Sequence, residues 1–339
     1  MQALSSSSKA TNLGLKKSTL KTVAPLMVAL SMTLIPALQA FALETSPAIT
    51  TTANAGDLFF DSDKSHEAER KEVETLLSDI EAQWNAHNLE KVMGCYAEEY
   101  INNDGLDKKA VSELTQEFWK TYPDAKSSSR TKQIRIEGNF ATVESRDTAV
   151  GTTANNPIHD NSLSGELSSV SEGQLYLKKT GTEWKIIGDR IDYEKVRVAY
   201  GVAKSLNVSF TAPEQVKSGK QYSARIDVDL PNGFLAVGSI TNQPLEYPQH
   251  TPNELWRAME PPSSLERLIA ANTNNKNELL MATIGITDIA SRKLVGIELL
   301  TRRMNVVPEV DPTKIQAATA LFGAPKEIKL KSEKKEQKD

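Results

Sequence analysis

The sequence predicts an α+β domain, three helices on an antiparallel sheet, followed by an all-β sandwich. Two observations predict this order. Apolar residues first recur every three or four positions, as on one face of a helix, and then alternate with polar residues, as in strands. With 339 residues the chain is also too long for one ordinary core, so we expect two domains.

Residues 1–42 are predicted to be a secretory signal peptide. Four lysines precede an uncharged apolar run from Val23 to Leu38, and Ala40 and Ala42 provide the small residues before an export cleavage site. The alternative is a retained membrane anchor. Prolines within the run argue against it, because a lone helix in lipid has no neighbour to satisfy the lost hydrogen bonds. We therefore expect an exported protein, periplasmic or secreted.

The charge of the chain disfavours nucleic acid as a partner. Removing the four lysines of the signal takes the formal net charge from −4 to −8, and an acidic surface repels phosphate backbones. The single cysteine, Cys95, has no partner for a disulfide and is interpreted as a small core residue.

A flexible leader is predicted over residues 43–66 and the α+β domain over residues 67–204. Its first helix places five apolar residues on one face, and a second helix, opened by Asn88, repeats the spacing. A third helix is opened by Asp107 and ended by Pro123. The three apolar faces are Val73, Leu76, Leu77, Ile80 and Trp84; Leu89, Val92, Met93, Tyr96 and Tyr100; and Val111, Leu114, Phe118 and Tyr122.

Four strands are predicted after the helices, because the period changes from 3.6 to 2. Lys132–Glu137 and Phe140–Thr148 form a hairpin turned at Gly138, and a second hairpin joins Gly173–Lys178 to Trp184–Ile191. Four antiparallel strands packed on three helices make an α+β layer architecture.

From residue 205 to residue 308 the chain reads as all-β. We expect an immunoglobulin-like sandwich of about seven short strands. Its clearest strands are Tyr222–Leu230, Phe234–Ile240, Leu279–Ile286 and Leu294–Leu300. The segment from Pro248 to Leu268 is predicted to be irregular apart from a turn at Glu254–Met259.

The C-terminal residues are predicted to form a helix at 309–324, opened by Asp311 and Pro312, and a disordered lysine-rich tail at 325–339. The four histidines have no metal-ligand spacing, and one cysteine cannot complete a zinc set. No glycine-rich phosphate loop and no nucleophile elbow are present. We expect no metal and no cofactor.

A run of short motifs resembles the nuclear transport factor 2-like superfamily, which includes the SnoaL-like polyketide cyclases and ketosteroid isomerase. The motifs are Trp84-Asn85-Ala86, Leu89-Glu90, Val92-Met93, Tyr96-Ala97-Glu98-Glu99 and Gly181-x-x-Trp184-Lys185-Ile186-Ile187. The resemblance covers about residues 67 to 200. It implies a cone, in which helices close a curved sheet around an apolar cavity. Members use that cavity for binding, for catalysis or for dimerisation, so the fold does not decide among these.

The resemblance places Asp104 where ketosteroid isomerase keeps its general base. A carboxylate at the mouth of an apolar cone would have a raised pKa and could remove a proton next to a carbonyl. The chain departs from the pattern at the two oxyanion donors, since Ile80 stands in the tyrosine's place and the second donor falls near Gly173. The alternative role for Asp104 is to form the turn that ends in Gly105.

Four further residues are candidates for the pocket lining. Trp84 and Tyr96 face inward from the helices, either as cavity lining or simply as core. Asp147 shares the parity of Ala141 in its strand, and Asp189 holds a corresponding place in the last strand. An inward carboxylate indicates a polar end of a pocket, whereas a swapped face would put both in solvent.

Two classes of function follow. The first is a non-catalytic envelope protein, whose cone binds a small apolar molecule or forms a homodimer and whose sandwich docks onto an envelope partner. The second is an exported cyclase, isomerase or dehydratase that uses Asp104, Asp147 or Asp189 as its acid or base. The missing oxyanion donors favour the first. A third reading fills the cavity with the protein's own side chains and leaves only a dimer interface.

Overall fold

The computed structural model describes residues 66–154, 164–247, 253–259 and 263–309. The predicted signal peptide, nearly all of the leader, the C-terminal helix and the lysine-rich tail lie outside these residues, as do His159 and His250. Within the described ranges, none of the helices combines the length and apolar character needed to cross a membrane.

Three helices come first, as predicted: α2 (Glu67–Asn85), α3 (Leu89–Gly94) and α4 (Lys108–Thr121). The two predicted caps are confirmed. The Asn88 side chain accepts a hydrogen bond from the Lys91 N–H, and the Asp107 side chain accepts one from the Ala110 N–H. The apolar face of α2 is buried through Val73, Leu77, Ile80 and Trp84.

The prediction of a long second helix is wrong. The α3 helix ends at Gly94, and Tyr96 and Tyr100 lie beyond it in a non-helical segment that contains a turn at Glu98-Glu99. That segment pairs with the strand from residue 183 on, since the Ala97 N–H donates to the Ile186 carbonyl and the Ile186 N–H to the Cys95 carbonyl. Sheet hydrogen bonds thus replace the helical ones after a glycine, which has low helix propensity.

Two hairpins follow, in the predicted order but with longer strands. They consist of β1 (Lys126–Glu137) with β2 (Phe140–Thr152), and β3 (Glu166–Thr180) with β4 (Glu183–Gly201). The first turn has Gly138 at φ 60° and the second has Gly181 at φ 63°, a region that favours glycine.

The remaining described residues are almost all β. They form the short helix η2 (Val202–Ser205) and β5 (Val208–Thr211), β6 (Gln215–Lys217), β7 (Gln221–Val228), β8 (Phe234–Pro244), β9 (Arg257–Met259), β10 (Ser264–Ala270), β11 (Glu278–Asp288) and β12 (Leu294–Val307). The expectation of irregular structure from Pro248 to Leu268 is wrong where it is described. That stretch contains β9 and most of β10, which are edge strands with weak alternation that gain their order by pairing with β8 and β7.

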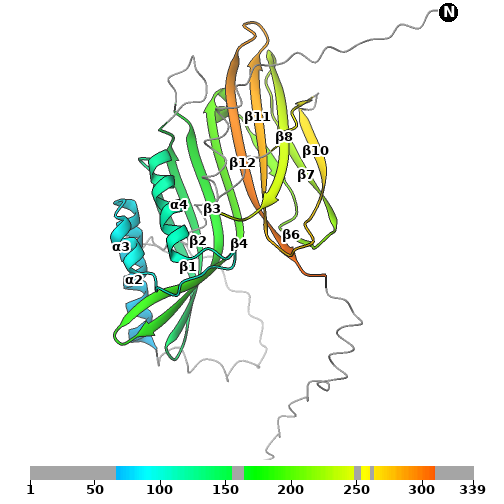
Figure 1. Cartoon of the computed structure of the whole chain (residues 1–339). Helices are drawn as coiled ribbons and strands as arrows, with labels where there is room; N and C mark the ends of the chain where they lie inside the picture. Colours follow the sequence, from blue (N-terminus) through cyan, green and yellow to red (C-terminus); the bar gives the residue numbers. More distant parts are fainter. Residues whose placement is uncertain (1–65, 155–163, 248–252, 260–262, 310–339) are drawn as a thin grey trace, which may run out of the picture.

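One sheet runs through both parts of the chain. Its strand order is β1-β2-β3-β4-β12-β11-β8-β9, so the last described strand, β12, inserts between β4 and β11 (Figure 1). The β4–β12 pairing runs from Gly201 opposite Gly296 to Lys195 opposite Arg302. The α+β part and the β-rich part are therefore joined by backbone hydrogen bonds and not only by a linker.

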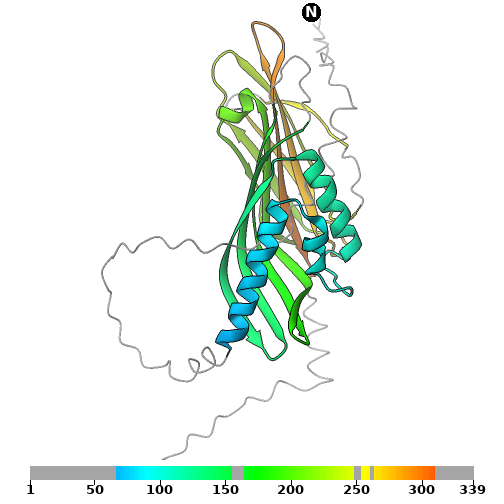
Figure 2. The ribbon, with the colours of Figure 1, turned by 90° about the vertical axis from the view of Figure 1, so that its left-hand side faces the viewer.

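The two ends of this sheet are covered on opposite faces. Helices α2 and α4 lie over β1 to β4 (Figures 1 and 2), whereas β10, β7 and β5 form a separate three-stranded sheet over β8, β11 and β12. Alternate side chains of β12 pack into the two cores on opposite faces of the sheet. Ile297 and Leu299 belong to the helix-side cluster, and Leu300 and Met304 to the other.

Gly201 holds the junction between the two parts. It has φ 57°, and a Cβ added there would collide with the Val295 carbonyl. We expect Gly201→Ala to lower the free energy of unfolding by at least about 3 kcal/mol, because strain and a backbone collision act together. The matched control is Gly181→Ala, which also has positive φ but has no atom within 4 Å of the added Cβ. Urea unfolding of both variants checks this, and equal losses would contradict it.

Candidate functional site

Asp104 is held by side chains from the β-rich part of the chain. Arg303, on β12, donates from Nη1 to Oδ2 at 2.8 Å and from Nη2 to Oδ1 at 2.7 Å. The Asn277 side chain donates to Oδ1 at 2.9 Å. The two charged side chains are only 7% and 1% exposed. Both oxygens of the predicted general base are thus engaged by donors in a forked ion pair.

The backbone around Asp104 forms the turn that the sequence suggested as the alternative. The Asn102 side-chain oxygen accepts from the Asp104 N–H at 3.0 Å and from the Leu106 N–H at 2.8 Å. Gly105 follows with φ 84°. The turn places the Asp104 carboxylate against β12, where it ties the helical layer to the β-rich part.

Asp189 lies inside the cone, beside Tyr100. The Tyr100 hydroxyl donates to Asp189 Oδ2, and both side chains are buried. Burial raises the pKa of Asp189 to about 7, while the Tyr100 hydrogen bond and the Arg303 charge oppose the rise. Burial and the neighbouring carboxyl also raise the pKa of Tyr100, which keeps its hydroxyl protonated as a donor.

Asp147 belongs to a line of polar residues that crosses the inner face of the sheet. It lies opposite Ser129 of β1 on one side and Ser171 of β3 on the other, and Ser171 lies opposite Glu194 of β4. Lys195 pairs with Arg302, so the next residues, Glu194 and Arg303, face each other on the inner side. We call Ser129, Asp147, Ser171, Glu194 and Arg303 the polar row.

The polar row is buried, and its acidic side chains outnumber its one cation, Arg303. Its five side chains are between 2% and 4% exposed. Burial raises the pKa of Glu194 to about 8, against the lowering effect of Arg303. One guanidinium therefore serves Asp104, Asp189 and Glu194. Three carboxylates cannot all be ionised around one cation at low cost, so the cluster retains protons near neutral pH.

Several buried polar atoms of the sheet and the helical layer have no hydrogen-bond partner among the described residues. They are Ser129 Oγ, Asp189 Oδ1, Glu194 Oε1 and Thr301 Oγ1 on the sheet, and Trp119 Nε1 and Tyr122 Oη on or just after α4. An unmade hydrogen bond on a buried group costs about 1 to 3 kcal/mol, and such groups in native proteins commonly pair with water or a bound molecule.

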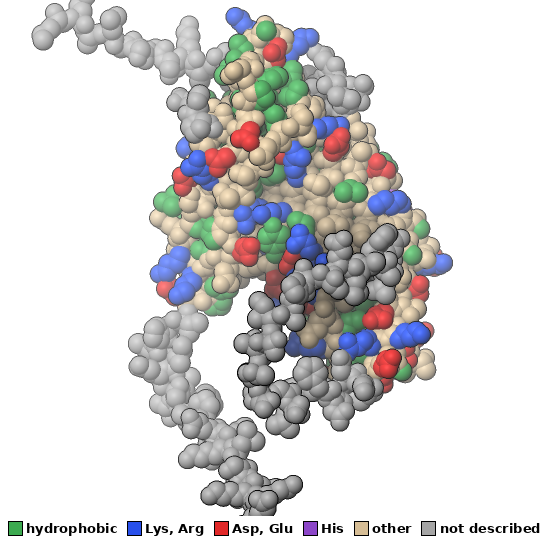
Figure 3. All heavy atoms as spheres, turned by 180° about the vertical axis from the view of Figure 1, so that it is seen from behind, with side chains coloured by type: hydrophobic (Ala, Val, Ile, Leu, Met, Phe, Trp, Pro, Cys, Tyr) green, Lys and Arg blue, Asp and Glu red, His purple; other side chains and the backbone are tan. Residues whose placement is uncertain are grey.

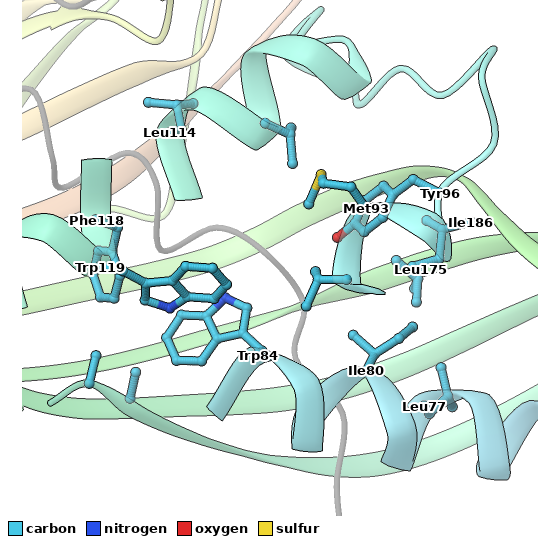
Figure 4. Packing of buried hydrophobic residues seen from close by; sticks show 14 of the residues in the cluster. Leu77, Ile80, Trp84, Met93, Tyr96, Leu114, Phe118, Trp119, Leu175 and Ile186 are labelled. Carbon is cyan, nitrogen blue, oxygen red and sulfur yellow. The ribbon is translucent and has the colours of Figure 1, made fainter. Parts of the chain in front are cut away.

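Trp84 and Tyr96, the predicted aromatic lining, pack into the helix-side core. The Trp84 ring lies 5.5 Å from that of Trp119 and 5.7 Å from that of Phe118, measured between centroids (Figure 4). The Tyr96 ring lies 4.9 Å from that of Tyr100. Both aromatic groups are nearly fully buried, and they flank the polar row from the helical layer.

Sequence reasoning missed Tyr100, Glu194 and Arg303. The sequence holds a signal for Glu194, because Glu194 alternates in step with Val196 and Val198. The predicted strand ends at Ile191, whereas β4 continues to Gly201. Arg303 had no comparable signal, since its role depends on β12 pairing with β4. In the described part of the chain, no three His, Cys, Asp or Glu side chains are grouped so that they could hold a metal ion.

Fold and site together define an α+β arrangement of three helices on an antiparallel sheet, extended by a β-rich part. No protein-family model matches the chain, and no curated protein matches it. Solved structures similar to it include Bd1075 of Bdellovibrio bacteriovorus (14% identity, TM-score 0.30, 38% of this chain).

Two further similar structures cover one part of this chain and nearly all of their own. A hexachlorocyclohexane dehydrochlorinase, LinA type 2, matches at 11% identity and TM-score 0.31, over 39% of this chain and 90% of that one. ActVI-ORFA of Streptomyces coelicolor matches at 8% identity and TM-score 0.28, over 37% and 94%. The chain spans about 42% of the length of Bd1075.

Proposed function

We propose that this protein binds a small, mostly apolar molecule between the helices of the cone and the polar row. The observation that carries the proposal is the set of buried, unpartnered polar atoms on the inner face, among them Ser129 Oγ and Glu194 Oε1. The polar row suits one hydrogen-bonding group on such a molecule.

The engagement of Asp104 supports binding over proton abstraction at that residue. A general base must reach its substrate with a free lone pair, whereas Arg303 and Asn277 hold both oxygens of this carboxylate.

Glu194→Met is expected to reduce the amount of small molecule retained through native purification at least about tenfold, because it removes both carboxyl oxygens from the inner face, including the unpartnered Oε1. Mass spectrometry of the molecules released on denaturation measures this. The matched control is Glu144→Met, on the opposite face of the same sheet, where the side chain is 42% exposed. Equal retention by both variants, or an empty wild-type protein, would contradict the proposal.

A second candidate function is an enzyme that uses Asp189 as its acid or base. The specific observation is the raised pKa of about 7 for Asp189 beside a tyrosine donor, which matches the demands of proton transfer near neutral pH. Asp189→Asn separates the two functions. A retained molecule that accumulates unchanged in that variant, but is converted by the wild type, would favour the enzyme.

The finer expectations stay predictions. These are export, a homodimer, and an immunoglobulin-like sandwich that docks onto an envelope partner. N-terminal sequencing of the protein recovered from cells checks the first, and sedimentation velocity checks the second.

A further inference from the structure

A groove lies on the face of the large sheet opposite to the helices. Its volume is about 480 Å³, within the range of about 300 to 1,000 Å³ typical of small-molecule sites. Its floor comes from β3, β4 and β12 and one wall from β5. Its charged lining residues are Lys195, Arg197 and Arg302, and Val170, Val208 and Leu300 are among its apolar ones.

Two cations face each other in the floor of this groove. Lys195 of β4 lies directly opposite Arg302 of β12, and Val170 of β3 lies on the other side of Lys195. Such cross-strand neighbours have Cβ atoms about 5 Å apart, and like charges in this position destabilise a sheet. The Lys195 ammonium lies 5.3 Å from the centre of the Tyr193 ring, a cation–π contact that does not neutralise it.

Arg302 is a buried arginine that forms no salt bridge among the described residues, although the Glu214 carboxylate acts on its charge from beyond contact distance. The residue is 5% exposed, and its Nη1 donates to the Phe210 carbonyl at 3.0 Å, while its Nε has no hydrogen-bond partner among the described residues. Arg197, the other arginine of the groove, is instead paired with Glu298 at 2.6 Å. A buried charge without a direct ion pair is costly, so we expect Arg302 to stabilise a bound anion more than the other groups of the groove do.

The wall of the groove adds hydrogen-bond donors. The Val228 N–H of β7 donates to the Ser263 carbonyl, on the side of β7 away from β5. Val208 of β5 lies opposite Val228, so its backbone N–H and C=O point away from β7. The backbone groups of Phe210, two residues further along β5, point the same way. The Phe210 carbonyl, which points away from β7, accepts the hydrogen bond from Arg302. The N–H groups of Val208 and Phe210 point the same way and are available to a ligand.

We propose that this groove binds a small organic molecule with an apolar body and one carboxylate group. The carboxylate lies between Lys195 and Arg302, and the apolar body contacts Val170, Val208 and Leu300. This face of the molecule carries charges of both signs among small apolar patches (Figure 3), so general basicity does not explain the unpaired cations. The proposal is independent of the function proposed for the cone, which uses the other face of the sheet.

The test uses the full chain and 4-phenylbutyrate as the probe, with 4-phenylbutanol as its uncharged match. We expect saturable binding of the carboxylate by titration calorimetry, and at least tenfold weaker binding of the alcohol. Arg302→Met and Lys195→Met should each weaken phenylbutyrate binding at least tenfold. Lys195 is only partly buried, so its variant keeps the test valid if Arg302→Met fails to fold.

The matched control is Lys185→Met, on the same strand but outside the groove, and it should bind phenylbutyrate as the wild type does. Equal binding of the acid and the alcohol would overturn the proposal, and so would undiminished binding by folded Lys195→Met. Inorganic phosphate that competes as strongly as phenylbutyrate would show a general anion site and would overturn the assignment to an organic carboxylate. Binding of an acidic peptide along β5 but not of phenylbutyrate would also overturn it.

Discussion

Arg303→Met is expected to lower the free energy of unfolding by about 3 to 5 kcal/mol, the range seen when one partner of a buried ion pair is removed. Arg303 is the cation nearest to the buried Asp104 carboxylate and lowers the pKa of both Asp189 and Glu194. Without it, Asp104 keeps only the Asn277 side chain as a neutral donor. Urea unfolding at pH 7 measures the loss.

The control for this variant is Arg225→Met. Arg225 also makes a forked contact with a carboxylate, that of Asp227, but both side chains are about 40% exposed. Exposed pairs contribute little to stability, so this variant should lose much less than Arg303→Met. Asp104→Asn added to Arg303→Met should recover part of the stability, because it removes the buried charge. An Arg303→Met loss no larger than that of Arg225→Met would contradict the role of the pair.

The same ion pair shows why the sequence alone leaves the role of Asp104 open between a catalytic carboxylate and a turn residue. A turn of Asn102, Asn103, Asp104 and Gly105 at the edge of a cone predicts equally well a catalytic carboxylate and a turn residue. What decides between them is a partner 199 positions away on β12. No local pattern contains that information, since it depends on which strand lies beside β4.

Elements with a strong period were predictable. The apolar faces of α2 and α4 and the glycine turns of the hairpins follow from spacing and backbone preference, and each is found in place. Elements that depend on partners were not. The segment after Gly94 has helical spacing, yet it pairs with Ile186 because the β4 edge offers hydrogen bonds. The short strands β5, β6 and β9 lack a period of their own.

For the two inward-facing carboxylates, too, the orientation follows from local spacing and the partners do not. Asp147 and Asp189 were predicted as candidates for inward-facing residues from parity alone, and both are buried. Their partners were not predicted, because β4 is irregular. Register shifts lie between Glu172 and Gly173 and between Tyr176 and Leu177 on β3, opposite β4. Each shift changes which residues of β4 face inward, which brings Asp189 and Glu194, five positions apart, onto one face.

Stability is expected to fall as the pH rises from about 4 to about 8, the interval between the ordinary and the raised pKa values of two buried acids. The pKa of Asp189 is raised to about 7 from an ordinary 3.8, and that of Glu194 to about 8 from 4.5. Between the ordinary and the raised values, the folded protein holds protons that the unfolded chain has released. The stabilisation is therefore complete below about pH 4 and is lost as each buried acid ionises.

The groups that face these acids set the size of the effect. Tyr100 and Arg303 favour ionised Asp189, and Asp104 opposes it. Arg303 also favours ionised Glu194. Each pKa unit corresponds to about 1.4 kcal/mol, so the loss across the range amounts to several kcal/mol. Unfolding in urea at a series of pH values measures it. The variant Asp189→Asn with Glu194→Gln should show a flatter profile and a higher relative stability at alkaline pH. An unchanged slope in that variant would show that other groups cause the fall.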